Sequence, residues 1–159
     1  MKIMLDNGAI CPTRAHATDA GLDLYSREEK TIYPCRTMES GIEELQYTGA
    51  VSMLRWSIGE TFDTGVHIAF DRGTYGKIES KSGLNVNHSV VSCGGVVDEG
   101  YTGSIAVKIY NLGIEPYTVH KGDKIAQLVI MPYLTPEIEI VSNLDDTDRG
   151  NNGFGSTGR

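Results

Sequence analysis

The chain has 159 residues, of which 40% are apolar and 22% charged, a composition typical of one globular domain. Lys and Arg number 14 against 21 Asp and Glu, so the formal net charge is −7. This acidic balance argues against nucleic acid or an anionic membrane surface as a partner. The three cysteines lack C-x-x-C spacing, which disfavours a disulfide framework or a cysteine zinc site. No signal peptide or membrane-spanning run is visible, so we expect a soluble cytoplasmic protein.

Short strands dominate the predicted secondary structure. Glycine accounts for 19 residues, which disfavours an all-helical bundle because interior glycine weakens helices. Apolar and other residues alternate with the period of a half-buried strand between 103 and 110. In chain order, the predicted strands are 66–70, 86–91, 103–110, 117–119, 125–131 and 137–140. A short helical turn is predicted at 40–47, and the strand spacing favours an all-β sandwich or barrel.

The chain beyond Ser142 is polar and rich in glycine. Residues 153–158 match G-x-G-x-x-G, but no helix can follow them, so they are not a dinucleotide fingerprint. Consecutive glycine N–H groups and two hydroxyls can nevertheless surround an anion, and Arg149 adds a guanidinium suited to phosphate. Taken alone, this segment is better explained as an ordinary disordered terminus.

Four other segments carry residues with chemical potential. In 94–103, Asp98 and Tyr101 lie three residues apart in what is predicted to be a tight hairpin. Segment 80–83 combines a cation with hydroxyls and glycine, and segment 20–24 places Asp23 between leucines. Segment 122–128 places Gln127 within an apolar strand, where a buried amide needs a partner. Taken alone, segment 94–103 is also explained by turn chemistry, segment 80–83 by a solvated loop, and Asp23 by a charge at a strand end.

Together and in this order, the five segments resemble the trimeric all-β dUTPases. The resemblance implies one jelly-roll-like β-sandwich core over 1–148, with an extended segment at about 35–58, and a mobile arm over 149–159. It implies hydrolysis of dUTP to dUMP and pyrophosphate, assisted by Mg²⁺, in a homotrimer whose subunits share active sites. Because the arm is too polar to form its own core, it needs a ligand or a neighbour to become ordered.

The resemblance also implies roles for individual residues. Asp98 corresponds to the carboxylate that activates water, and Tyr101 to the ring that excludes a 2′-hydroxyl. Main-chain groups near Val96, Val97 and Ala106 correspond to those that read uracil.

For the phosphates, Asp23 corresponds to the carboxylate that holds Mg²⁺ through water. The residues that correspond to phosphate-binding or closing groups are Lys81, Ser82, Gly83, Gln127, Arg149, Phe154, Gly155, Ser156 and Thr157. Phe154 is the one expected to stack on uracil.

The sequence departs from the family pattern at three places. Lys81 stands where arginine is usual, which keeps the charge but loses the bidentate fork. Ser92 stands where many members have asparagine, and we keep it as a candidate substrate-binding residue. The extended segment at about 35–58 is either a surface elaboration or an element that binds a protein partner or the trimer edge.

Two other functions stay open from the sequence. A dCTP deaminase of the same fold would not need Phe154, and it would release ammonia from dCTP. A regulatory protein on a dUTPase scaffold would use the 35–58 segment to hold a partner.

Overall fold

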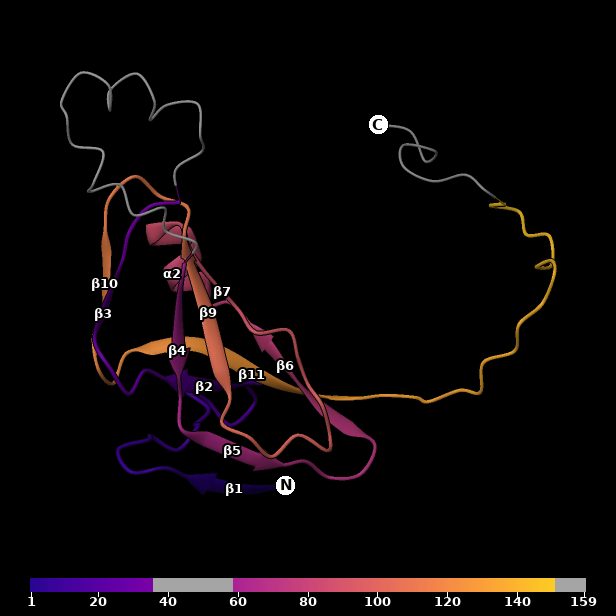
Figure 1. Cartoon of the computed structure of the whole chain (residues 1–159), viewed down its shortest axis with the longest axis horizontal. Helices are drawn as coiled ribbons and strands as arrows, with labels where there is room; N and C mark the ends of the chain where they lie inside the picture. Colours follow the sequence, from indigo (N-terminus) through magenta and orange to yellow (C-terminus); the bar gives the residue numbers. More distant parts are fainter. Residues whose placement is uncertain (36–58, 151–159) are drawn as a thin grey trace.

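The computed structural model of the chain describes residues 1–35 and 59–150. Nearly all the regular structure in these ranges is β, as predicted (Figure 1). The elements are β1 (Lys2–Leu5), β2 (Gly21–Tyr25), β3 (Lys30–Ile32), β4 (Glu60–Asp63), β5 (Val66–Ala69), β6 (Thr74–Glu79), α2 (Ser82–His88), β7 (Val90–Cys93), β8 (Val96–Val97), β9 (Ala106–Asn111), β10 (Tyr117–Val119) and β11 (Lys124–Pro132). Across the described residues, no helix has the length and apolar character needed to cross a bilayer.

The strands form two principal sheets around one core. One sheet has the order β2-β11-β6-β8 and the other β4-β9-β7, while β1–β5 and β3–β10 are two-stranded pairs. Side chains from both principal sheets enter the same apolar cluster, including Leu24, Leu128, Phe62 and Ile109, each fully buried. The arrangement is the jelly-roll-like sandwich expected from the sequence.

The alternating strand prediction at 103–110 is confirmed by burial in β9. Val107 and Ile109 are fully buried, whereas Ala106 is exposed and Lys108 and Tyr110 are partly exposed. Strands predicted at 66–70, 117–119 and 125–131 correspond to β5, β10 and β11. Alternation of β-branched residues identified these strands because one face of each packs on the core.

Two strand predictions are wrong. Most of the predicted strand at 86–91 is helix α2 and its cap, since Ser89 takes φ 54° and ends the helix before β7. Val86 is 80% exposed on this helix, so its strand propensity gains nothing from burial. Residues 137–140 form no strand, because in the described chain they have no neighbour to complete a ladder. The helical turn predicted at 40–47 lies outside the described residues.

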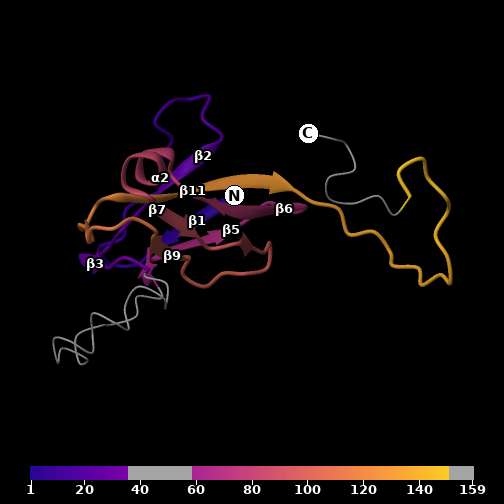
Figure 2. The same ribbon diagram turned by 90° about the horizontal axis from the view of Figure 1, so that it is seen from above.

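The chain after β11 runs away from the body of the molecule in both views (Figures 1 and 2). Leu134, Ile138 and Ile140 are each more than 90% exposed on this segment. Isolated apolar side chains on a surface are ordinary, but a run of them on a detached segment needs a partner surface.

Asn111 at the end of β9 joins three segments through its buried amide. Its Nδ2 donates to the carbonyls of Ile32 at 2.9 Å and Glu115 at 2.7 Å, and its Oδ1 accepts from the N–H of Gly113 at 2.9 Å. Each unsatisfied buried group costs roughly 1 kcal/mol or more, so the whole amide contributes a few kcal/mol.

We expect Asn111→Ala to lower the free energy of unfolding by about 3 kcal/mol, because it leaves three backbone groups without partners. Urea denaturation followed by circular dichroism measures this change. Asn87→Ala on the exposed face of α2 is the matched control and should lie within about 0.5 kcal/mol of the wild type. Equal losses in the two variants would contradict this role for Asn111.

Candidate functional site

A row of polar side chains crosses one face of the larger sheet. Strand β11 pairs Gln127 with Asp23 of β2 on one side and with Glu79 of β6 on the other. Directly paired residues point to the same face of a sheet, so these three side chains are neighbours. Gly21 leaves room for the Gln127 amide, since a Cβ at Gly21 would lie 2.5 Å from its Oε1.

Asp23 is buried and is held between two lysines. Its Oδ1 lies 2.5 Å from Nζ of Lys81, and its Oδ2 lies 2.7 Å from Nζ of Lys124. Burial alone would raise the pKa of Asp23, but hydrogen bonds and positive charge from Lys124 and Lys81 hold it below its ordinary value. Asp23 and its two lysines together carry one negative and two positive charges, and Glu79 on the other side of Gln127 is paired with Lys77. The two ammonium groups are suited to a phosphate ligand.

Ser82 and Gly83 follow Lys81 directly and open helix α2. Both residues are exposed, and a Cβ placed on Gly83 would meet no atom within 4 Å. Their positions are compatible with the phosphate contacts expected from the sequence. Lys124, which the sequence analysis did not single out, completes this group from the far side of Asp23.

The turn that carries Asp98 and Tyr101 connects the two principal sheets. Val97 of β8 pairs with Gly76 of β6, whereas β9, which follows the turn, pairs with β4 and β7. The expected hairpin between two paired strands is therefore wrong, because the two-residue β8 completes the other sheet. The N–H of Tyr101 donates to the carbonyl of Asp98 at 3.0 Å, which closes the turn and leaves the Asp98 carboxylate exposed.

The Tyr101 ring lies against the backbone that returns from the turn. Its hydroxyl donates to the carbonyl of Ser104 at 3.0 Å, and a Cβ at Gly103 would lie 2.5–3.0 Å from the ring. Only glycine at position 103 permits this packing. A Cβ at Gly94 would meet the Ala106 carbonyl at 3.1 Å, so this glycine lets the strands before and after the turn approach closely.

Glu99, next to Asp98, anchors the turn to the rest of the molecule. Its carboxylate accepts from the N–H of Gly73 and from the hydroxyl of Tyr133, each at 2.7 Å. The Tyr133 hydrogen bond, followed by that of Gly73, lowers the pKa of Glu99, so this carboxylate stays ionised. Sequence analysis missed Glu99 and Tyr133, because nothing in their spacing of 34 residues indicates contact.

Ser92 has a structural partner in this chain. It is buried in β7, its hydroxyl donates to the carbonyl of Ile125, and its N–H donates to Oγ of Ser80 at 3.2 Å. These bonds join β7 to β11 and to the end of β6. A substrate contact by the Ser92 side chain stays a prediction.

The candidate residues form two separate groups in a single chain. Val96 and Val97 pair with the early part of β6, whereas Lys81 lies beyond the end of that strand. Five residues of extended chain from Gly76 to Lys81 span about 15 Å. The described residues contain no hydrogen bond or ion pair between the turn at 98–101 and the Asp23 cluster.

The arm contributes one described candidate. Arg149 is exposed in a turn in which the N–H of Gly150 donates to the carbonyl of Thr147 at 3.0 Å. Phe154, Gly155, Ser156 and Thr157 lie outside the described residues, so their contacts stay predictions.

Few of the described side chains are placed to bind a divalent metal. No cluster of three His, Cys, Asp or Glu side chains with metal-binding geometry occurs within 1–35 and 59–150. Asp23 is the one candidate ligand among these residues, and both of its oxygens face lysines. Mg²⁺ often binds through one or two carboxylates together with substrate phosphates and retained waters. Asp23 could therefore serve only as the single protein carboxylate beside a metal that arrives with a polyphosphate.

Comparison with known proteins identifies the family. The family model described as dUTPase matches residues 45–158. The chain belongs to the dUTPase family. The deoxyuridine 5′-triphosphate nucleotidohydrolase of Clostridium novyi is 39% identical over 163 residues, which cover 99% of both chains. The mitochondrial human enzyme of the same name is 40% identical over 155 residues, 98% of this chain, which spans only 53% of the human protein.

Solved structures of dUTPases share the fold. A mutant dUTPase of Staphylococcus bacteriophage 80alpha with dUpNHpp has a TM-score of 0.78 and 26% identity, covering 99% of this chain and 98% of that one. A mutant dUTPase from phage phi11 of S. aureus has a TM-score of 0.71 and 25% identity, covering 89% of this chain and 96% of that one. The phi11 protein is described as coordinating a structural Mg(II) ion.

We expect Asp23→Asn to lower the free energy of unfolding at pH 7 by about 2 kcal/mol, since two lysines lose their counter-charge. The pKa of Asp23 is lower in the folded state, so its stabilisation is present above about pH 4 and is lost as pH falls through the folded value. The difference between wild type and variant should therefore shrink on acidification.

Denaturation midpoints from pH 7 to pH 3 measure this trend. Asp71→Asn is the control, because Asp71 is 76% exposed in its ion pair with the N-terminus and should contribute little. A difference between wild type and Asp23→Asn that does not change with pH would contradict the assigned ion pairs.

Proposed function

We propose that this member of the dUTPase family hydrolyses dUTP to dUMP and pyrophosphate, with Asp98 as the general base. The observation that carries the proposal is the anchored turn at 98–101. It presents an exposed carboxylate and an aromatic ring on a rigid connection between two sheets. Catalytic groups on a loop held by a rigid scaffold are the usual arrangement for positioned chemistry.

In the proposed reaction a water oxygen attacks the α-phosphorus as the bond to the β-phosphate oxygen breaks. Asp98 accepts the proton of the water, and pyrophosphate leaves with the bonding electron pair. Glu99 keeps the carboxylate of Asp98 in place through its bonds to Gly73 and Tyr133. Such hydrolysis depends mainly on positioning and on charge stabilisation rather than on covalent catalysis.

Recognition of the nucleoside is assigned to the turn and the strands beside it. The Tyr101 ring packs beneath the deoxyribose and leaves no room for a 2′-hydroxyl. Backbone groups near Val96, Val97 and Ala106 read the edge of uracil, and the close approach at Gly94 shapes this part of the pocket. Phe154 of the arm stacks on the base.

Recognition of the phosphates is assigned to the Asp23 cluster and the arm. Lys81 and Lys124 supply positive charge, with Ser82, Gly83 and Gln127 beside them. Arg149, Gly155, Ser156 and Thr157 are the contributions of the arm. Asp23 is the residue that would hold Mg²⁺ through water, and the metal would supply positive charge to the bound triphosphate.

Release of pyrophosphate from dUTP, dTTP, dCTP and UTP tests this function directly. We expect turnover of dUTP, and no ammonia from dCTP. Ammonia release from dCTP would instead identify a deaminase of the same fold.

We expect Asp98→Asn to lower kcat for dUTP by about 10²–10⁴-fold, the usual contribution of general base catalysis. Binding of a non-hydrolysable dUTP analogue should stay within a few fold of the wild type, because the amide preserves the shape of the turn. Steady-state kinetics and calorimetry measure the two quantities. Normal turnover by this variant would show that Asp98 is not the base.

A homotrimer with shared active sites is also proposed. Its first support is the separation of the turn from the phosphate cluster, which a second copy can bring together. Its second support is the exposed apolar face of the segment after β11, which a neighbouring copy can cover. Burial of an isoleucine side chain contributes about 2 kcal/mol.

We expect the wild type to sediment as a trimer at micromolar concentration, and Ile138→Ser with Ile140→Ser to weaken the assembly. Analytical ultracentrifugation measures both. Ile114→Ser is the control, since Ile114 is 85% exposed on the loop between β9 and β10. A wild-type monomer at micromolar concentration would exclude the trimer.

We expect truncation after Asp148 to cut dUTP turnover steeply without changing the melting temperature of the ligand-free protein. Ordering each residue costs roughly 1–2 kcal/mol, so closure of the arm needs contacts with the triphosphate. Kinetics and thermal melting measure the two effects. Full activity of the truncated protein would contradict closure over the nucleotide.

Two further proposals concern the location of the protein and its binding to another protein. A cytoplasmic location is proposed, and cell fractionation tests it. A protein partner at the 35–58 segment is proposed as well, although this segment lies almost entirely outside the described residues.

A further inference from the structure

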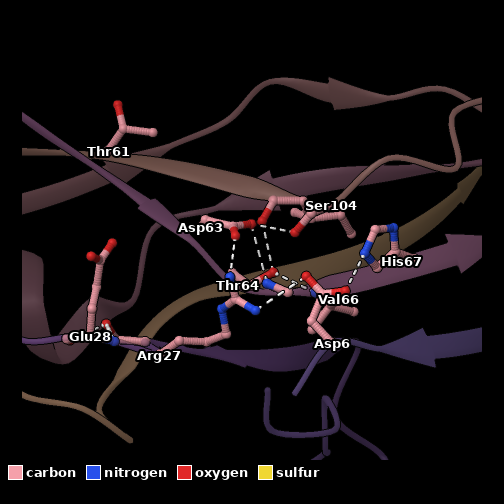
Figure 3. Close-up of polar contacts among 12 residues, drawn as sticks. Asp6, Arg27, Glu28, Thr61, Asp63, Thr64, Val66, His67 and Ser104 are labelled. Carbon is pink, nitrogen blue, oxygen red and sulfur yellow. Dashed lines mark hydrogen bonds and ion pairs between the residues drawn. The ribbon is translucent and has the colours of Figure 1, made fainter. Parts of the chain in front are cut away.

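A second polar network includes His67 of β5 together with Asp6, Arg27, Asp63 and Ser104 (Figure 3). Nδ1 of His67 lies 2.8 Å from the carbonyl oxygen of Thr102, and Nε2 lies 3.2 Å from Oδ1 of Asp6. Thr102 follows Tyr101 in the chain. His67 therefore contacts the backbone that returns from the candidate site.

The partners of His67 determine its protonation. A carbonyl oxygen and a carboxylate oxygen are both acceptors, so each contact requires an N–H on the ring. A neutral imidazole has one N–H and can satisfy only one of the two, whereas the imidazolium satisfies both. The arrangement in the structure, with one ring nitrogen at the Thr102 carbonyl and the other at Asp6, is therefore that of protonated His67.

The same backbone has a second anchor at Asp63. The hydroxyl of Ser104 donates to Oδ1 of Asp63, and Nη2 of Arg27 lies 2.5 Å from Oδ2 of Asp63. Nη1 of Arg27 lies 3.2 Å from Asp6. The charged groups around His67 are thus two carboxylates, Asp6 and Asp63, bridged by one guanidinium (Figure 3).

The two anchors act on the segment that supports the Tyr101 ring. His67 fixes Thr102, and Asp63 fixes Ser104. Between them lies Gly103, against which the ring packs, and the tyrosine hydroxyl is bonded to the Ser104 carbonyl. The position of the ring thus depends on two side chains, His67 and Asp63, to which the proposed nucleotide contacts assign no role.

We propose that His67 is a positioning residue for sugar discrimination, which holds the segment 102–104 so that the Tyr101 ring excludes a 2′-hydroxyl. This inference rests on the proposed dUTP hydrolysis. Loss of the His67 contact frees Thr102, so the ring can move away from the sugar. The preference for dUTP over UTP then falls more than activity toward dUTP itself, because only the 2′-hydroxyl of UTP needs the vacated space.

The preference for dUTP over UTP should depend on pH, and the protonation of His67 determines the direction of the change. The bond to the Thr102 carbonyl and the charges of Asp6 and Asp63 raise the pKa of His67 above its ordinary value, against the effect of partial burial. Both anchoring bonds are present below this pKa, and one is lost as pH rises through it. The preference for dUTP over UTP is therefore highest in mildly acidic buffer and falls at alkaline pH.

The experiment measures kcat/KM for dUTP and for UTP from pH 6 to pH 9 in the wild type, His67→Ala and His67→Gln. Taking the ratio cancels the ionisation of Asp98 and of the shared base and triphosphate. We expect the dUTP/UTP ratio of the wild type to fall several-fold across this range. We expect both variants to have a dUTP/UTP ratio about tenfold lower than the wild type at pH 6, because a small displacement of a positioning group has effects of this size. We also expect their ratio not to change with pH.

Two further variants separate an effect on segment 102–104 from a general effect of substitution. Ser104→Ala removes the other anchor and should lower the ratio without removing the pH step. His120→Gln is the matched control, because His120 also pairs with a carboxylate, Glu29 at 2.7 Å, but does not contact segment 102–104. Thermal melting verifies that each variant is folded.

The outcomes separate this inference from the proposed function. No dUTP turnover by the wild type would refute the function itself. If the wild type hydrolyses dUTP while folded His67 variants keep its dUTP/UTP ratio and its pH step, the positioning role is wrong. The same ratio change in His120→Gln would also overturn it, since the effect would then not come from segment 102–104.

Discussion

Strand β11 is bonded on both sides, to β2 and to β6, and this double pairing determines where the candidate phosphate-binding residues lie. It places Gln127 between Asp23 and Glu79 and brings Lys124 within reach of the Asp23 carboxylate. Without β11 the sheet would lose its central strand, and Asp23 would keep only Lys81. The same strand ends at Pro132, where the chain leaves the body of the molecule.

The turn at 98–101 depends on the opposite edge of this sheet. Strand β8 is only two residues long, and it aligns the turn by pairing with β6. Three side-chain anchors then fix the turn from different directions: Glu99, Ser104 and His67. Their partners lie in the β5–β6 turn, in β4, in the loop after β1 and just beyond β11, so a short turn is attached to several parts of the fold.

The sequence predicts the parts of the fold that depend on local alternation. Strand β9 was recognisable because Val107 and Ile109 alternate with outward residues, and this pattern reflects burial on one face. The same reasoning failed at 86–91, where the chain closes a helix at Ser89 although its valines favour strands. Pairing of β8 with β6 was not predictable, since two residues carry no periodicity.

Ordered motifs identified the family and its candidate residues, but not the contacts among them. Asp23 and Lys81 are 58 residues apart, and Glu99 and Tyr133 are 34 apart, so only the folded sheet brings each pair together. Lys124 was within a recognised motif, yet its role became visible only through the register of β11 against β2. Long-range electrostatic contacts of this kind leave no spacing signal in a single sequence.

The exposed segment after β11 also bears on how the protein avoids aggregation while it is made. Leu134, Ile138 and Ile140 are exposed on this segment in the single chain, so they are accessible in a newly made copy. Glu137 and Glu139 alternate with Ile138 and Ile140, so identical segments aligned in parallel register bring like charges together. Such charges act as gatekeepers beside an apolar strand, and they disfavour fibrous stacking while leaving a dissimilar acceptor surface available.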